Sequence, residues 1–259
     1  MGSWGGGTYN PRMTADTREI LYGAWRGYFE RFPDFFEVEQ DGMRVAGAGI
    51  PVPLFNCAYP KRRVSRRDFE RLTADFSRVL APRGVPGLLM ARTDQIEAPP
   101  GIEPAIRMPG MVAGELVAPK FPSANLDLRE VSGEKMAEEI ARLNVLAHGM
   151  PAGEIEPMTC AALWEAPNHG FLLYLDGEAV AAGSASFSDG ASYIGWMATD
   201  TRYRGRGCAE AILRHMDAFM RRKYGVTESV LHATELGRPV YERVGYRIVD
   251  EIVGYLVGS

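Results

Sequence analysis

The feature that most constrains the fold of this chain is a glycine-rich turn in its C-terminal third. The run 200–209 (DTRYRGRGCA) follows an apolar, strand-like segment at 192–199 and precedes a periodic helical segment at 210–223. A strand that leads through glycines into a helix N-terminus can bind an anion, because backbone N–H groups and the helix dipole face the ligand. Gly205 and Gly207 let the backbone approach a phosphate closely and adopt unusual φ values.

Two well-known phosphate-binding patterns do not fit this turn. The Walker loop ends in Gly-Lys-Ser/Thr, and the dinucleotide fingerprint needs G-x-G-x-x-G early in a βαβ unit. Here no glycine stands three positions after Gly207, and the turn lies far along the chain. Arg202, Arg204 and Arg206 add fixed positive charge of the kind that binds phosphate oxygens.

The pattern Arg-x-x-Gly-x-Gly at 202–207 resembles the acyl-coenzyme A pyrophosphate loop of the GNAT acyltransferase superfamily. A second segment, 237–249 (GRPVYERVGYRIV), resembles the closing motif of that family, a short helix that ends in Tyr-x-x-x-Gly-Tyr and runs into a strand. Gly245 fits the left-handed residue after the helix. Segment 227–233 fits the strand between the two motifs, and the resemblance covers residues 127–259.

The resemblance implies an α/β (α+β) GNAT fold, in which helices flank a mixed central sheet. Hydrophobic periodicity in the second half of the chain predicts elements in the order of that fold. These are a strand at 126–131, a helix at 134–148, a short helix at 160–164, a hairpin at 170–187, and then the strand, loop, helix, strand, helix and strand that carry the motifs.

The sequence predicts a flexible arm at 1–16, an additional N-terminal α/β domain at 17–122 and a catalytic GNAT domain at 123–259. The N-terminal domain is expected to contain helices within 18–36 and 67–81, a hairpin at 36–50 and a buried strand at 87–92. Residues 94–124 are rich in proline and glycine, with 119–124 as a linker. The order of elements suggests a partial GNAT repeat, which we interpret as degenerate and non-catalytic because it lacks an Arg-x-x-Gly-x-Gly loop.

Composition narrows the class of protein. A net charge of −4 argues against nucleic-acid binding as the main role, and the basic cluster at 61–67 is interpreted as a solvated helix entry. The three cysteines lack metal-ligand spacing, so no metal site is predicted. No apolar run is long enough to span a membrane and no signal peptide is apparent, which favours a cytoplasmic protein without membrane partners. A homodimer is compatible with this interpretation.

The resemblance also implies which residues do the chemistry. Acetyl-CoA would be the acyl donor, and Tyr241 of the closing motif would be the general acid that protonates the leaving thiolate. The backbone N–H of Met197 or Ala198 would polarise the acyl carbonyl. The residues that map onto the coenzyme site are Met197, Ala198, Thr199, Arg202, Arg204, Gly205, Arg206, Gly207, Cys208, Ala209 and Thr234.

This chain departs from the family pattern in several places. Thr234 and Gly237 stand where many relatives have asparagine and alanine. Cys208 could be a reactive thiol at a helix N-terminus, but a buried inert thiol is the favoured interpretation. The strand before the loop has no glutamate to act as the base, so the base is left unassigned. The alternatives are a water chain or one of Asp189, Asp200, His232, His148, Glu154 and Glu156, each of which has a simpler structural or solvated role.

Three function classes follow. The first is an acetyl-CoA-dependent N-acetyltransferase that acts on a small-molecule amine by direct attack in a ternary complex. The second is a protein or peptide N-acetyltransferase. The third is a non-catalytic module that binds acyl-CoA, which the intact loop and Tyr241 disfavour.

Overall fold

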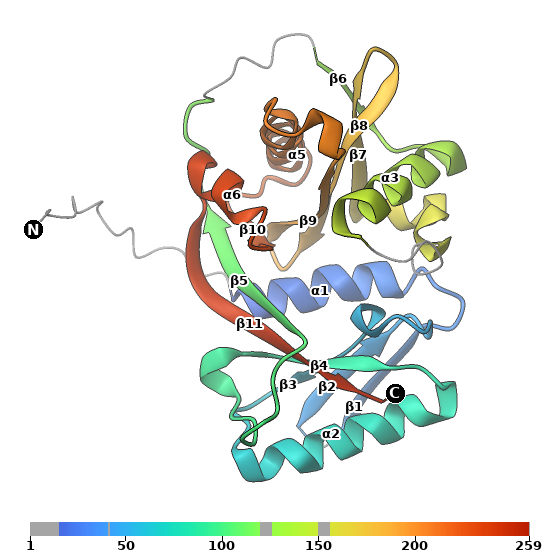
Figure 1. Ribbon diagram of the computed structural model, residues 1–259, viewed down its shortest axis with the longest axis vertical. Coiled ribbons are helices and arrows are strands. Elements are labelled where there is room, and N and C mark those ends of the chain that lie inside the picture. The colour runs from blue at the N-terminus through green and yellow to red at the C-terminus, as the bar shows by residue number, and fades with distance from the viewer. Residues whose placement is uncertain (1–15, 41, 120–125, 150–155, 259) are drawn as a thin grey trace, which may run out of the picture.

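Eleven strands form one continuous mixed sheet that runs through the structure (Figure 1). The structure is a computed structural model that describes residues 16–40, 42–119, 126–149 and 156–258. The order across the sheet is β1 (Phe36–Gln40), β2 (Met43–Gly47), β3 (Asn56–Pro60), β4 (Gly87–Arg92), β11 (Arg247–Val257), β5 (Ile106–Ala113), β10 (Ser229–His232), β9 (Ala191–Thr199), β8 (Glu178–Ser188), β7 (Asn168–Leu175) and β6 (Asp127–Glu130). The α-helices are α1 (Thr17–Phe29), α2 (Arg66–Leu80), α3 (Gly133–His148), α5 (Cys208–Tyr224) and α6 (Arg238–Val244).

The two halves of the chain repeat the same strand pairing. In the first half β1, β2 and β3 pair in antiparallel fashion, and α2 then connects β3 to the parallel strand β4. In the second half β7, β8 and β9 pair in the same way, and α5 connects β9 to the parallel strand β10. The interpretation of the N-terminal half as a partial repeat requires such a shared order, and it stays a prediction.

The halves exchange strands where they meet. Strand β5 from the first half lies between β10 and β11, and it pairs with both in antiparallel fashion. Strand β11 from the second half continues past β5 to pair with β4. The sheet therefore crosses the predicted boundary at 122/123, and the division into separate domains stays a prediction.

Strand β5 lies inside the stretch 94–124 that the sequence presents only as rich in proline and glycine. Pro109 and Gly110 interrupt its apolar pattern, which is why periodicity does not reveal it. The predicted helix at 160–164 is a 3₁₀ turn, Ala161–Trp164. The predicted arm at 1–16, except for Asp16, and most of the predicted linker lie outside the described residues.

Helix α1 lies between the part of the sheet that contains β1–β4 and the part that contains β6–β10 (Figure 1). Its contacts with β8 and β9 are aromatic and neutral. The Tyr28 hydroxyl donates to Ser184 Oγ at 2.7 Å, and the Trp25 indole N–H donates to the Tyr193 hydroxyl at 3.3 Å. These contacts satisfy polar atoms that would otherwise be buried unpaired, so they fix α1 against β8 and β9.

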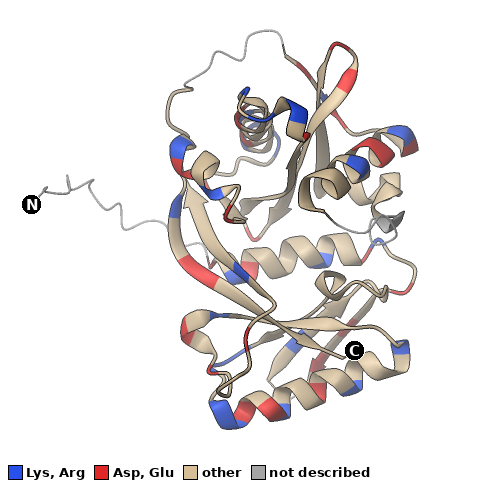
Figure 2. Cartoon of the chain, in the orientation of Figure 1, with Lys and Arg blue, Asp and Glu red and all other residues tan. Residues whose placement is uncertain are grey.

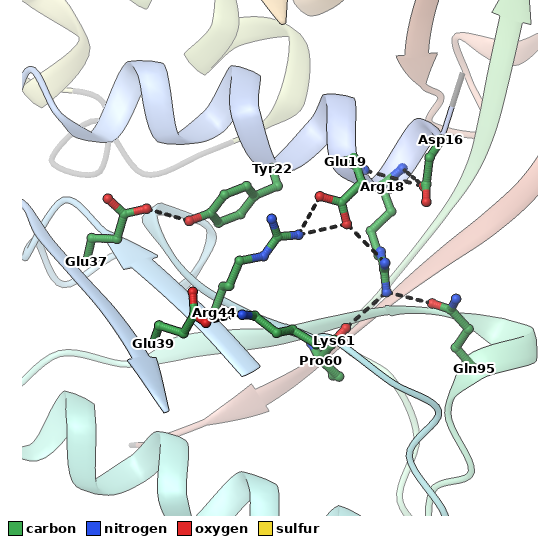
Figure 3. A network of polar contacts seen from close by, with 10 residues as sticks. All are labelled: Asp16, Arg18, Glu19, Tyr22, Glu37, Glu39, Arg44, Pro60, Lys61 and Gln95. Carbon is green, nitrogen blue, oxygen red and sulfur yellow. Dashed lines mark hydrogen bonds and ion pairs between the residues drawn. The ribbon is translucent and has the colours of Figure 1, made fainter. Parts of the chain in front are cut away.

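Charged side chains near the start of α1 hold it to the first half (Figure 3). Arg44 of β2 forms an ion pair with Glu19 at 2.6 Å, and its guanidinium lies 4.1 Å from the centre of the Tyr22 ring. Arg18 donates to the Pro60 carbonyl and to Gln95, both at 3.0 Å. One helix therefore joins both halves through different kinds of contact.

Helix α2 covers the far side of the first half and is amphipathic, as its periodicity predicts. Phe69, Leu72, Phe76 and Leu80 are buried against the sheet, while charged residues occupy the outer surface of the helix (Figure 2). This arrangement is what the hydrophobic stripe of the sequence requires. None of the helices among the described residues has both the length and the apolar character needed to cross a membrane.

Candidate active site

The candidate site is built around a bulge in β9. Trp196 has φ of 51°, an uncommon conformation for a bulky residue. The register with β8 shifts between Ala182 and Ser184, so that only Gly183 lies opposite Trp196 and Met197. A bulge bends its strand and frees backbone groups from the ladder.

Strand β9 leaves β10 at the same point. The parallel register between the two strands ends at the pair Ile194–Leu231, although β9 continues to Thr199. Among the described residues, Trp196 and Met197 therefore have no register partner on either neighbouring strand. The strands therefore separate next to Met197 and Ala198, whose backbone N–H groups are assigned to the acyl carbonyl.

Two helix-end contacts hold the bulge in place. The Asn144 side chain of α3 donates to the Trp196 carbonyl at 3.4 Å. His148, at the end of α3, lies with Nε2 3.2 Å from the Met197 carbonyl, a contact in which Nε2–H is the donor. Burial lowers the pKa of His148. Because its Nε2 is engaged with the backbone, His148 acts here as a support for the bulge.

The glycine turn follows directly after β9 and leads into α5. Gly205 and Gly207 have φ of 75° and 82°, which confirms the left-handed conformations expected of them. Gly207 is the N-cap of α5 and has no side chain to cap the first turn. The N–H groups at the start of this helix are therefore available to an anion.

The three arginines of the turn have different surroundings. Arg202 binds Asp200 at 2.7 Å and also pairs with Glu178, so its charge is already neutralised. Arg204 contacts the carbonyls of Thr199 and Ala147, and Arg206 lies 5.1 Å from the centre of the Tyr203 ring. In the described part of the chain Arg204 and Arg206 have no acidic partner. These two side chains are the ones left to bind a phosphate, whereas Arg202 shapes the turn.

Asp200 is the acidic residue nearest the turn. Its carboxylate accepts from the Arg202 backbone N–H at 2.9 Å and from the Arg202 guanidinium, and these bonds lower the pKa of Asp200 to about 2. A carboxylate held ionised in this way is a weak proton acceptor at neutral pH. Asp200 therefore shapes the turn and is a poor candidate for the base.

Tyr241 and Thr234 lie at the second motif. Tyr241 is buried in α6 beside Tyr246, with ring centres 6.0 Å apart, and burial raises its pKa. A raised pKa keeps the phenol protonated, as a general acid requires. The Thr234 hydroxyl accepts from the Gly237 N–H at 3.2 Å, so it helps to form the entry of α6.

Helix α6 is fixed beside α5 by an acidic residue of α5. Glu210 is buried, binds Arg214 at 2.8 Å and lies 3.6 Å from Arg243 of α6. The two helices that follow β9 and β10 are therefore held together on one face of the sheet. Cys208 at the start of α5 is buried and its pKa is raised by that burial, so it is an inert thiol rather than a nucleophile.

The remaining candidates for the base are dispersed. Asp189 lies in the β8–β9 turn with φ of 46°, remote from the bulge along the strand. Glu154 lies outside the described residues, as does the side chain of Glu156. His232 lies at the end of β10. Within 16–40, 42–119, 126–149 and 156–258 no cluster of side chains suits a metal ion.

The structure thus brings together the end of β9, the glycine turn, the start of α5 and the entry of α6. The predicted coenzyme residues lie on these elements, and their roles, like that of Tyr241, stay predictions. One polar residue near this region was missed by sequence reasoning. Asp250 and Glu251 together interrupt the apolar residues 248–257 of β11, and this interruption was the available signal.

Comparisons with known proteins agree with this geometry. Residues 166–248 match a family model described as "Acetyltransferase (GNAT) domain". A search of curated proteins found no match.

Solved structures share the architecture of the chain. A GCN5-related N-acetyltransferase from Kribbella flavida is similar with 16% identity and a TM-score of 0.69, covering 94% of each chain. A protein from the GNAT family of Novosphingobium aromaticivorans is similar with 17% identity and a TM-score of 0.63, covering 95% of this chain and 100% of that one. A conserved protein of unknown function from Staphylococcus epidermidis is similar with 11% identity and a TM-score of 0.62, covering 90% of this chain and 97% of that one. Because the sequence identities are 17% or lower, these similarities establish the fold alone.

Proposed function

We propose that this chain, in which residues 166–248 match an acetyltransferase (GNAT) domain, is an acetyl-CoA-dependent N-acetyltransferase that acts on a small-molecule amine. The observation that carries the proposal is the bulged end of β9, which separates from β10 and leads through two left-handed glycines into the N-terminus of α5. Backbone N–H groups without a register partner at the bulge and the free N–H groups at the start of α5 then follow one another along the chain. An acyl thioester with a phosphorylated carrier suits both.

The residues present fit the coenzyme. The first turn of α5 would bind its pyrophosphate together with the guanidinium groups of Arg204 and Arg206, which have no acidic partner among the described residues. The backbone N–H groups at the bulge would bind the acyl carbonyl, which becomes more negative as the amine attacks. Trp196 and Met197 are already held out of the ladder, so these donors need no rearrangement before the reaction.

The transfer needs two proton movements. A nitrogen–carbon bond forms as the neutral amine attacks the thioester carbonyl, and the carbon–sulfur bond then breaks. The amine proton goes to a base, and the phenol of Tyr241 gives its proton to the departing thiolate. The phenol is protonated at neutral pH, and burial raises its pKa further.

A small acceptor is favoured over a peptide by the position of α1. This helix packs on the sheet beside β9 and β10 and is fixed there by Trp25 and Tyr28. A long peptide laid across this face would have to displace it. A protein or peptide acceptor remains the second candidate, and a non-catalytic acyl-CoA module the third.

Calorimetric titration of acetyl-CoA into the purified protein tests the proposal most directly. We expect binding with a dissociation constant in the micromolar range, because several charged hydrogen bonds contribute at the pyrophosphate. Folded protein that binds no acetyl-CoA would refute both the enzyme and the acyl-CoA module. Binding without release of free coenzyme A in the presence of amines would favour the module.

Replacing Tyr241 with phenylalanine tests the acid. The substitution removes one hydroxyl and keeps the buried ring, so the fold should persist. We expect kcat to fall by about 10²-fold or more, with little change in the KM of acetyl-CoA. Tyr246→Phe is the matched control, because that buried hydroxyl is bonded to Ser229 at 2.6 Å within the core. If Tyr241→Phe has the kcat of the wild type, Tyr241 is a packing residue.

A further inference from the structure

His232 is half-buried, but its two imidazole nitrogens are shielded from solvent. Both ring nitrogens are buried and neither forms a hydrogen bond with any described residue. The nearest ring is that of Tyr193, with centres 5.9 Å apart. His232 is the last residue of β10, one position beyond the end of the register with β9. Its side chain therefore lies beside the separation of the two strands.

Asp250 also has a buried oxygen atom that lacks a hydrogen-bond partner among the described residues. Its Oδ2 accepts from the Thr17 hydroxyl of α1, whereas Oδ1 has no partner among the described residues. The bulge of β11 occurs between Ile248 and Asp250, and it sets Asp250 opposite Gly110 of β5. Burial raises the pKa of Asp250 above its usual value.

These two groups lie on one face of the sheet with a glycine between them. Gly110 is in register with His232 on one side and with Asp250 on the other. Residues directly opposite in neighbouring strands point to the same face, and two strand spacings separate the outer Cα atoms by about 10 Å. A Cβ on Gly110 would collide with Asp250 Oδ1 and lie 3.2 Å from Thr17 Oγ1. The carboxylate thus extends over Gly110 toward His232.

Few charged groups influence the pKa of Asp250 or of His232. On Asp250, Arg92 of β4 acts to lower the pKa, while Asp16 and Asp94 act to raise it. No charged group contributes to the pKa of His232, which burial alone lowers to about 3, so the imidazole is neutral at pH 7. A neutral imidazole has a lone pair that can accept a proton. Because its pKa is low when it stands alone, His232 can act as the base only with the ionised carboxylate of Asp250 beside it to stabilise the imidazolium.

Unpartnered buried polar groups oppose folding, and proteins retain them mainly where a ligand satisfies them. Here one group is a carboxylate oxygen and the other is an unprotonated base. A ligand that suits both must donate hydrogen bonds to the carboxylate and release a proton to the imidazole. A primary ammonium does both.

We infer that Asp250, Gly110 and His232 form the binding site of the acceptor amine. Asp250 binds the amine in its ammonium form over Gly110, and His232 receives the proton that must leave before or during attack. His232 passes this first proton to water, the freed nitrogen lone pair forms the new bond to the acyl carbon, and His232 then takes the second nitrogen proton. The carbon–sulfur bond breaks, Tyr241 protonates the departing thiolate, and the proton held by His232 returns through water to the Tyr241 phenolate. The inference rests on the proposed function, and it assigns the base that the sequence left open.

Replacing His232 with leucine tests the role of the imidazole. With acetyl-CoA and a panel of phenethylamine, putrescine and glucosamine, we expect kcat to fall by about 10²-fold, with unchanged binding of acetyl-CoA. The melting temperature should rise, because the variant removes two unsatisfied nitrogens.

The matched control is His169→Leu. His169 is buried, but its nitrogens lie 2.6 Å from Glu130 and 2.7 Å from the Tyr224 hydroxyl. We expect this control to lower the melting temperature and leave kcat near that of the wild type. A His232→Leu protein that melts below the wild type, or that turns over as fast, would overturn the inference.

Asp250→Asn tests the binding of the ammonium, because asparagine can still accept from Thr17. We expect the KM of the amine to rise by about 10-fold or more while the KM of acetyl-CoA stays constant. The control is Glu251→Gln, next along β11, whose carboxylate pairs with Arg107 at the surface at 3.2 Å. Equal effects of the two substitutions would overturn the role of Asp250. If the wild type acetylates none of the three amines, the proposed function fails for them, and the melting temperature of His232→Leu still decides whether its imidazole is unsatisfied.

Discussion

Replacing Gly207 with valine is expected to abolish the binding of acetyl-CoA, lowering affinity by about 10²-fold or more. Gly207 has φ of 82°, which a β-branched residue tolerates poorly. The variant can relieve this strain only by moving the first turn of α5, which carries the N–H groups assigned to the pyrophosphate. Calorimetry with acetyl-CoA measures the effect.

A control variant must separate the effect of backbone strain from the loss of the pyrophosphate site. Gly190 has a similar φ of 78°, lies in the β8–β9 turn and has open space around its Cβ position. Gly190→Val should therefore carry a comparable backbone cost and bind acetyl-CoA like the wild type. If Gly207→Val keeps full affinity and its melting temperature shows that it is folded, the pyrophosphate binds elsewhere.

Cutting the chain into its two predicted domains is expected to destroy the fold of the second. A fragment of residues 123–259 lacks β5, which pairs with β10 on one side and β11 on the other. It also lacks β4, the partner of the end of β11. Exposed strand edges of this kind promote aggregation. We expect the fragment to be insoluble or unfolded and to bind no acetyl-CoA.

Two companion experiments show whether strand exchange is the cause. Co-expression with residues 1–122 should restore a soluble complex that binds acetyl-CoA. A protease site placed at 122/123 and cut after folding should leave both pieces associated, since β5 and β11 still pair across the break. A monomeric 123–259 fragment with the affinity of the whole chain would mean that the halves are independent.

The sequence predicted those parts of the structure that have local signals. The turn at 205–207 needs glycines, the helix after it is periodic, and Gly245 ends α6 with φ of 111°. Hairpins formed where Asp-Gly pairs stand between apolar runs, as at Asp176–Gly177. Each of these features depends on residues close together in the chain.

The exchange of strands has no such signal. Pairing between β5 and β10 joins residues more than a hundred positions apart, and no pattern within either strand indicates which strand it pairs with. The same holds for the candidate amine site. His232 and Asp250 are ordinary strand residues in the sequence, and only the register of both with Gly110 brings them to one face.

The position of β11 also has a consequence for synthesis. Every other strand of the sheet leaves the ribosome before β11, yet β11 is the strand that joins β4 to β5. Until it emerges, β4 and β5 each expose an edge while the rest of the chain is already made. We therefore expect nascent chains that stop short of residue 247 to be held by chaperones rather than released, and folding to follow emergence of β11 in a single late step.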